Sequence, residues 1–91
     1  MIPHNEQTDT VSRAFLSLSS IEECYELFED LLTIKELQSL SQRLEVARLL
    51  NAGATFSEIV EETGASTATI GRVNRALNYG AGGYKLVLGR K

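Results

Sequence analysis

The segment 55–77 constrains the fold most, because it contains the start and stop signals of two short helices in succession. Thr55 and Glu58 form a Thr-x-x-Glu pair ahead of an apolar run, the pattern of a capping box at a helix start. Gly64 stands where a left-handed residue commonly ends a helix, and either Ser66 or Thr67 can cap a second one. Two short helices joined by a three-residue turn with a glycine form the outline of a helix-turn-helix, a motif that binds DNA.

The second helix of this segment is predicted to have an inward and an outward side. Ile70, Val73 and Leu77 recur at spacings of three and four residues, which predicts a buried stripe with Ala76 beside it. Gly71 destabilises a helix interior by about 1 kcal/mol relative to Ala, which suggests close approach of another backbone, a ligand or a duplex; simple tolerance of a surface glycine is the alternative. Small hydroxyl side chains in the first turn would lie near phosphates and base edges. The polar residues expected to face DNA are Ser66, Thr67, Thr69, Arg72 and Arg75.

Charge is distributed unevenly along the chain. The net charge is −3, yet residues 1–63 hold all twelve acidic side chains and a net charge of −8, whereas residues 64–91 have a net charge of +5 and no acidic side chain. Because phosphates attract cations and repel carboxylates, an acidic scaffold with a basic last third suits a DNA-binding protein. A basic tail of no consequence is the alternative. The basic residues of the last third are Arg72, Arg75, Lys85, Arg90 and Lys91.

The rest of the chain also shows helical periodicity. Apolar residues recur at spacings of three and four over residues 11–32, and Ser20 with Glu23 forms another capping-box pattern. A third such pattern at Thr33 opens a helix that is expected to stop near Asn51. One face of that helix carries Leu37, Leu40, Leu44 and Ala47, and Val46, Leu49 and Leu50 widen this stripe. No convincing strand precedes residue 80, so the chain is expected to be all-α.

The expected organisation is one helical domain over residues 1–91. A chain this short buries only a modest fraction of its surface on folding, so a single copy would have marginal stability. Dimerisation would stabilise it. The expected parts are a flexible amino terminus at 1–8, scaffold and dimerisation helices at 9–52, the helix-turn-helix at 55–78, and an arm or short helix at 79–91.

Several function classes are not supported by the residues. Cys24 has no second cysteine for a disulfide and no neighbouring His or Cys to share a metal, so we expect a buried thiol and no metal site. No arrangement of catalytic side chains or phosphate-binding loop stands out, so an enzyme is not expected. No run approaches the roughly 18–20 apolar residues of a membrane span, and residues 1–9 lack the order of a secretion signal, which favours a cytoplasmic protein.

The sequence resembles the Trp repressor superfamily, specifically the branch labelled YerC/YecD, over the run 40–77. Glu-Thr-Gly-Ala at 62–65 and Ala-Thr-Ile-Gly-Arg at 68–72 carry the resemblance, which extends from Leu32 to about Leu88. It implies an intertwined homodimer of helices that presents two helix-turn-helix units to successive major grooves and represses transcription.

The resemblance also implies roles for individual residues at the DNA. Ser57 lies in the first helix of the motif, where members of the family carry basic residues that contact phosphates. The base-facing positions of the family fall on Thr67, Ala68, Thr69 and Gly71.

The effector site of the family falls on two arginines of this chain, Arg43 and Arg72. The Gly that makes room for the indole ring in tryptophan-binding members is Val73 here, and the Ser that holds the amino group is Ala76. Overpacking a tight site costs about 1–3 kcal/mol, and losing a hydrogen bond to a charged group costs about 1.5–3 kcal/mol. Tryptophan is therefore not expected as the corepressor, and no cofactor is predicted.

The sequence thus predicts a homodimeric, sequence-specific DNA-binding transcriptional regulator, a repressor by resemblance, whose partners are double-stranded DNA and a second copy of the chain. Two alternatives remain open. One is a helical protein-interaction module whose basic end meets an acidic partner. The other is a regulator in which Arg43 and Arg72 hold a small carboxylate other than tryptophan.

Overall fold

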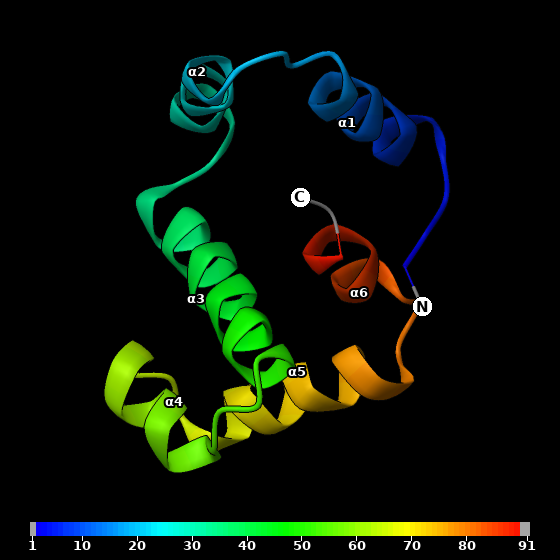
Figure 1. The fold of residues 1–91 in the computed structure, drawn as a ribbon. Helices are drawn as coiled ribbons and strands as arrows, with labels where there is room; N and C mark the ends of the chain where they lie inside the picture. The colour runs from blue at the N-terminus through cyan, green and yellow to red at the C-terminus, as the bar shows by residue number, and fades with distance from the viewer. Residues whose placement is uncertain (1, 90–91) are drawn as a thin grey trace. The chain divides into compact units, whose positions relative to one another are not determined.

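The computed structural model describes residues 2–89, and this range contains six α-helices and no strand. The expected all-α class is therefore confirmed. In chain order, the helices are α1 (Glu6–Leu16), α2 (Ile21–Leu31), α3 (Ile34–Asn51), α4 (Phe56–Thr63), α5 (Thr67–Tyr79) and α6 (Gly83–Leu88) (Figure 1).

The chain forms two compact units, which divide between Ile34 and Lys35. The first unit holds α1 and α2, and the second holds nearly all of α3 together with α4, α5 and α6. The division falls inside the segment 9–52 that the sequence assigns to scaffold helices. The expected single domain and its internal boundaries stay predictions.

In the first unit, α1 begins at Glu6, earlier than the boundary near residue 9 that the sequence indicated. The side chain of Asn5 accepts a hydrogen bond from the Thr8 N–H at 2.9 Å, and the Thr8 hydroxyl accepts one from the Asn5 N–H at 2.9 Å. This reciprocal pair satisfies two amides that a helix start would otherwise leave without partners. Asn5 therefore extends α1 beyond its apolar stripe.

The start of α2 lies after Ser20, as expected, but the predicted capping box is only half formed. Ser20 Oγ accepts a hydrogen bond from the Glu23 N–H at 3.1 Å. The Glu23 carboxylate accepts hydrogen bonds from the N–H of Ser19 at 2.8 Å and from its hydroxyl at 3.0 Å. The reciprocal bond thus goes to Ser19, the residue before the cap. These bonds favour the charged carboxylate and lower the pKa of Glu23.

Neither α1 nor α2 contains a buried residue. Phe15 is 44% exposed and Tyr25 61% exposed, although both lie on the apolar stripes of their helices. Tyr25 and Phe28 form an edge-to-face pair with ring centroids 6.1 Å apart. Cys24 is a free thiol and half-buried, whereas the sequence led us to expect a buried one. The first unit thus leaves apolar surface open to solvent.

The core of the second unit lies where α3, α4 and α5 meet. Val46 and Ala47 of α3, Ile59 of α4, and Ile70 and Val73 of α5 are at most 2% exposed. The partly buried apolar residues around this core are Leu49, Leu50, Ala54, Tyr84 and Leu88. These contacts hold α4 and α5 against the carboxyl-terminal end of α3, as Figure 1 shows.

Only the carboxyl-terminal half of α3 is buried. Leu40 and Leu44, which the sequence placed on one face with Ala47, are 44% and 43% exposed. The apolar stripe of α3 is therefore buried in one chain only in part. The helix ends at Asn51, as expected, and Gly53 with φ +92° turns the chain toward α4.

The carboxyl-terminal part of the described chain is helical. Of the two alternatives, arm or short helix, residues 83–88 form the short helix α6. Its Tyr84 and Leu88 pack against the core, while Leu86 and Val87 are exposed. A Cβ at Gly80, between α5 and α6, would clash with the backbone carbonyl of Ala76, so a glycine is required where α5 ends.

Candidate nucleic-acid interface

A three-residue turn, residues 64–66, joins α4 to α5. At the start of α4, the Thr55 N–H donates to the Glu58 carboxylate at 2.9 Å, and the Glu58 N–H donates to the Thr55 hydroxyl at 3.2 Å. These bonds also lower the pKa of Glu58. At the end of α4, Gly64 is left-handed with φ +71°, and its N–H donates to the Val60 carbonyl at 2.9 Å. The predicted capping box and glycine cap are both confirmed.

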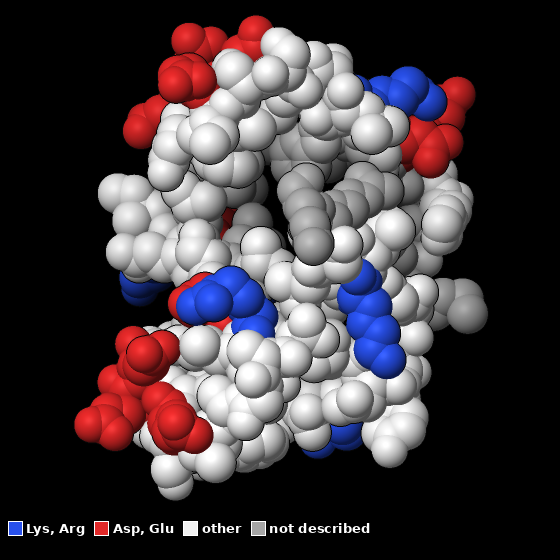
Figure 2. Space-filling model, viewed as in Figure 1, with Lys and Arg blue, Asp and Glu red and all other residues white. Residues whose placement is uncertain are grey.

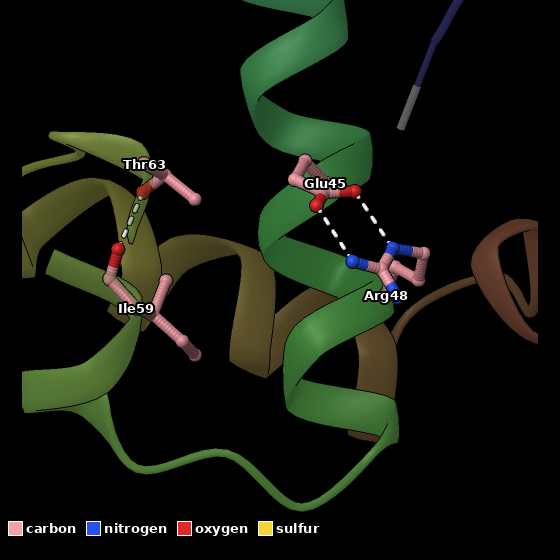
Figure 3. A network of polar contacts seen from close by, with 4 residues as sticks. All are labelled: Glu45, Arg48, Ile59 and Thr63. Atoms are coloured by element: carbon pink, nitrogen blue, oxygen red, sulfur yellow. Dashed lines mark hydrogen bonds and ion pairs between the residues drawn. The ribbon is translucent and has the colours of Figure 1, made fainter. Parts of the chain in front are cut away.

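Thr63 anchors the turn on both sides. Its hydroxyl donates to the Ile59 carbonyl at 2.7 Å (Figure 3) and accepts a hydrogen bond from the Ala65 N–H at 3.1 Å. Its carbonyl accepts a hydrogen bond from the side-chain amide of Gln42 on α3 at 3.2 Å. The turn is thus tied to α3 by a bond that sequence reasoning missed. No periodicity marks Gln42, because its partner is a backbone carbonyl far along the chain.

The first turn of α5 exposes small polar and apolar residues. Ser66 is the N-cap: its Oγ accepts a hydrogen bond from the Thr69 N–H at 3.1 Å and donates one to Thr69 Oγ1 at 3.1 Å. Ser66, Thr67 and Ala68 are exposed, while Thr69 is half-buried. The two hydroxyls are therefore paired with each other, and the exposed backbone of the first turn stands at the positive end of the helix dipole.

Beyond its first turn, α5 separates into the predicted inward and outward sides. Ile70, Val73 and Leu77 are buried, which confirms the expected stripe, whereas Ala76, predicted beside the stripe, is exposed. Helical spacing places several exposed or half-buried residues away from the stripe, Arg72 among them. We call four of them the outward face of α5: Thr67, Ala68, Gly71 and Arg75.

The basic side chains of α5 are not neutralised by carboxylates. Among residues 2–89, the one ion pair within 4 Å joins Arg48 and Glu45 of α3 at 2.7 Å (Figure 3). This pair raises the pKa of Arg48 and lowers that of Glu45. Arg72 and Arg75 are both exposed. They lie in residues 64–91, which contain no acidic side chain. Over α5, the coloured side chains in view in Figure 2 are blue.

The first helix of the motif differs in charge from α5. Carboxylates gather over α4 in Figure 2, and the helix carries Glu58, Glu61 and Glu62 without a basic residue. Ser57, the residue of this helix that the sequence assigned to the DNA, is exposed in its first turn. Because carboxylates are repelled by phosphates, α4 is less suited than α5 to contact a duplex.

A cavity of about 240 Å³ lies between α3 and α5. The two arginines that the resemblance paired, Arg43 and Arg72, both line it, and the Arg43 Nε donates to the Ser39 carbonyl at 3.3 Å. Arg72 therefore lies at the cavity, to one side of the outward face. The remaining lining residues are Ser39, Gln42, Thr69 and Val73.

The other basic residues of the last third lie on or beyond α6. Lys85 of α6 is exposed, whereas Arg90 and Lys91 lie outside the described residues. Within residues 2–89, no group of three or more His, Cys, Asp or Glu side chains could hold a metal ion. In the same range, no helix combines the length and apolarity that a membrane crossing requires.

The chain is similar to several known proteins along most of its length. It is 55% identical over 85 residues to the uncharacterized protein YerC of Bacillus subtilis (strain 168), with 93% of this chain and 82% of YerC covered.

Two crystal structures are also similar to it. One is a candidate Trp repressor from Staphylococcus aureus, with a TM-score of 0.91 and 47% identity over 96% of this chain and 87% of that chain. The other is a TrpR-like protein from Eubacterium eligens ATCC 27750, with a TM-score of 0.91 and 51% identity over 94% of this chain and 89% of that chain. The sequence model of the Trp repressor protein family matches residues 6–91, and the chain therefore belongs to the Trp repressor family.

Proposed function

We propose that this protein is a homodimeric, sequence-specific DNA-binding regulator of transcription that acts as a repressor. The observation that carries the proposal is the outward face of α5, an exposed and basic helical surface positioned by a capped, anchored turn. An α-helix of this kind fits the major groove of B-form DNA. Family membership supports the same function.

In this proposal, α5 is the recognition helix. Thr67, Ala68 and Gly71 lie near base edges, and Arg75 contacts a guanine or a phosphate. Ser57 and Ser66 lie near phosphates at the starts of α4 and α5. Lys85 adds attraction that does not depend on base sequence.

The apolar surface outside the core supports the homodimer. Phe15 and Tyr25 in the first unit and Leu40 and Leu44 on α3 are all more than 40% exposed. Exposed apolar side chains that gather on a helix face are typical of an interaction surface. A second copy that covered these residues would also supply a second α5. Two recognition helices one helical turn apart would then bind the two halves of a palindromic site.

The test is selection of bound duplexes from a random pool, followed by measurement of the dissociation constant against salt concentration. We expect a short palindromic site and an affinity that falls steeply with salt. Arg75→Ala is expected to weaken binding and to lower the salt slope by about one unit, since one phosphate contact accounts for about that much. Arg13→Ala, which removes an exposed arginine from α1, is the matched control and should change neither.

Equal affinity and equal slope for wild type and Arg75→Ala would show that α5 is not the recognition helix. Failure to enrich any site would favour the protein-interaction module instead, because an adaptor selects no sequence.

The cavity between α3 and α5 supports a second component of the proposal, a small carboxylate as effector. Two guanidinium groups beside hydroxyl and amide groups suit a carboxylate, which arginine binds through paired hydrogen bonds. Val73 is 2% exposed and lines this cavity, so an indole ring would meet a β-branched side chain there. Tryptophan is accordingly not the proposed effector.

A thermal-shift screen of amino and keto acids tests this component, because a ligand that binds the folded state raises Tm. We expect at least one small carboxylate to raise the Tm of the wild type, and Arg43→Ala to abolish the increase. If no compound shifts Tm, Arg43 and Arg72 are scaffold or phosphate contacts.

A further inference from the structure

The outward face of α5 has a gap in its middle, at Gly71, where a helical residue has no side chain. We propose that Gly71 is a close-approach position, at which the bare backbone lets a DNA duplex seat nearer to α5 than any other residue would allow. The proposal deepens the function above and rests on it: α5 must first be the recognition helix.

Nothing inside the folded chain requires a glycine at this position. The backbone of Gly71 is helical, and a Cβ built there would meet only Arg75 Nη1, at an ordinary contact distance of 3.7 Å. Gly64 and Gly80 differ, because the former has φ +71° and the latter lies against the Ala76 carbonyl. Alanine would therefore fit at Gly71 and would favour the helix, since glycine is among the poorest helix formers.

Arg75 and Ala68 are the neighbours of Gly71 along the outward face. Arg75 lies one turn further along α5, and its long side chain runs back toward the start of the helix, as helical side chains do. Its guanidinium lies next to the position that a Gly71 side chain would occupy. Ala68, one turn before Gly71, adds only a methyl group. The outward face thus presents a shallow step at Gly71, where the half-buried backbone lies beside a cation.

A step of this kind suits the edge of a duplex. Glycine permits the close approach of a backbone to a ligand, and the guanidinium beside the step can bind a guanine or a phosphate at the same time. No acidic side chain follows Gly64 in the sequence, so no carboxylate of this segment opposes the approach. Glycine lowers the stability of the helix. In this proposal, closer contact with DNA offsets that loss, and no contact within the fold does.

The experiment compares wild type with Gly71→Ala on the duplex selected by the wild type. We expect Gly71→Ala to have an equal or higher Tm and a dissociation constant at least about tenfold larger, the size of effect expected when one base contact is disturbed. Gly83→Ala is the matched control, because Gly83 is also helical, in the first turn of α6, and a Cβ there meets nothing within 4 Å. It should leave the dissociation constant unchanged.

Three outcomes are decisive. An unchanged dissociation constant for Gly71→Ala would overturn the proposal, as would a lower Tm, which would show that the fold itself requires glycine. If the wild type selects no duplex, the proposed function fails before this inference is reached.

A double variant separates close approach from an effect on Arg75. The larger dissociation constant caused by Gly71→Ala should persist when it is introduced into Arg75→Ala. If Gly71→Ala no longer changes the dissociation constant in the Arg75→Ala variant, the added methyl group acts by displacing the guanidinium. The proposal of close approach by the backbone would then be wrong.

Discussion

Thr63 and Gly64 decide the direction in which the chain leaves α4. The hydroxyl of Thr63 bonds to residues on both sides of it, and Gly64 adopts a backbone conformation that residues with a Cβ rarely adopt. Both residues act locally, yet they set where α5 begins. Their effect on stability can be separated from their effect on DNA binding.

Gly64→Ala is expected to destabilise the fold by about 1–2 kcal/mol, the usual penalty for a left-handed residue with a side chain. The penalty comes from the backbone alone, because a Cβ at Gly64 would meet no atom within 4 Å. Gly64→Asn should destabilise less, since asparagine tolerates this conformation. Urea unfolding measures both variants, and equal stability of Gly64→Ala and wild type would contradict the left-handed cap.

Two glutamates in helix caps should make stability depend on pH. The hydrogen bonds from Ser19 and from Thr55 lower the pKa of Glu23 and of Glu58 in the folded state, below the ordinary value of 4.5. Their contribution to the free energy of unfolding is therefore complete above about pH 4.5 and is lost as the pH falls through the lowered values.

Urea unfolding at pH values from 7 to 3 tests this expectation. The variants Glu23→Gln and Glu58→Gln should lose less stability on acidification than wild type. A pH dependence as steep as that of wild type in both variants would show that other groups cause the acid sensitivity.

At the scale of elements, α5 is positioned by its contacts with α3 and α4. Ile59 and Ile70 are fully buried, and the bond from Gln42 to Thr63 ties the turn to α3. The helix ends were predictable because caps depend on neighbouring residues: Thr55 and Gly64 act as expected. The Gln42 bond was not predictable, because it depends on how α3 lies across the turn.

Truncation of Ile70 should destabilise the second unit in proportion to the volume removed. We expect about 0.5–1.5 kcal/mol for Ile70→Val and about 2–5 kcal/mol for Ile70→Ala, since the side chain is fully buried. Val60→Ala is the control, because Val60 is 38% exposed on α4. Thermal and urea unfolding measure the series, and equal effects at Val60 and Ile70 would contradict the described core.

At the scale of the whole molecule, the main feature is the set of exposed apolar residues, which a single chain leaves in contact with solvent. They recur at helical spacing on α1, α2 and α3, and neither α1 nor α2 contains a buried residue. In the proposed homodimer, a second copy covers them. The oligomeric state and DNA binding should therefore change together.

The double variant Leu40→Glu/Leu44→Glu is expected to be monomeric and to lose site-specific DNA binding by at least about a hundredfold, since one recognition helix then binds one half-site. Gln38→Glu/Ser41→Glu, at two exposed polar positions of the same helix, adds the same two charges as a control and should remain dimeric. Sedimentation and a binding titration measure both. A wild type that sediments as a monomer would contradict the homodimer.

The sequence by itself determined the features that arise between near neighbours: the helical class, the caps at Thr55 and Gly64, and the buried stripe of α5. These follow from backbone conformation and from spacings of three and four residues, which a linear chain already contains. The resemblance on residues 62–72 also led to the correct family.

Only the tertiary structure decided which predicted surfaces are covered. It tied Gln42 to the turn and left Leu40 and Leu44 exposed. It also showed that a side chain would fit at Gly71. Each of these depends on the position of one helix against another, and burial between distant segments has no period along the chain from which it could be predicted.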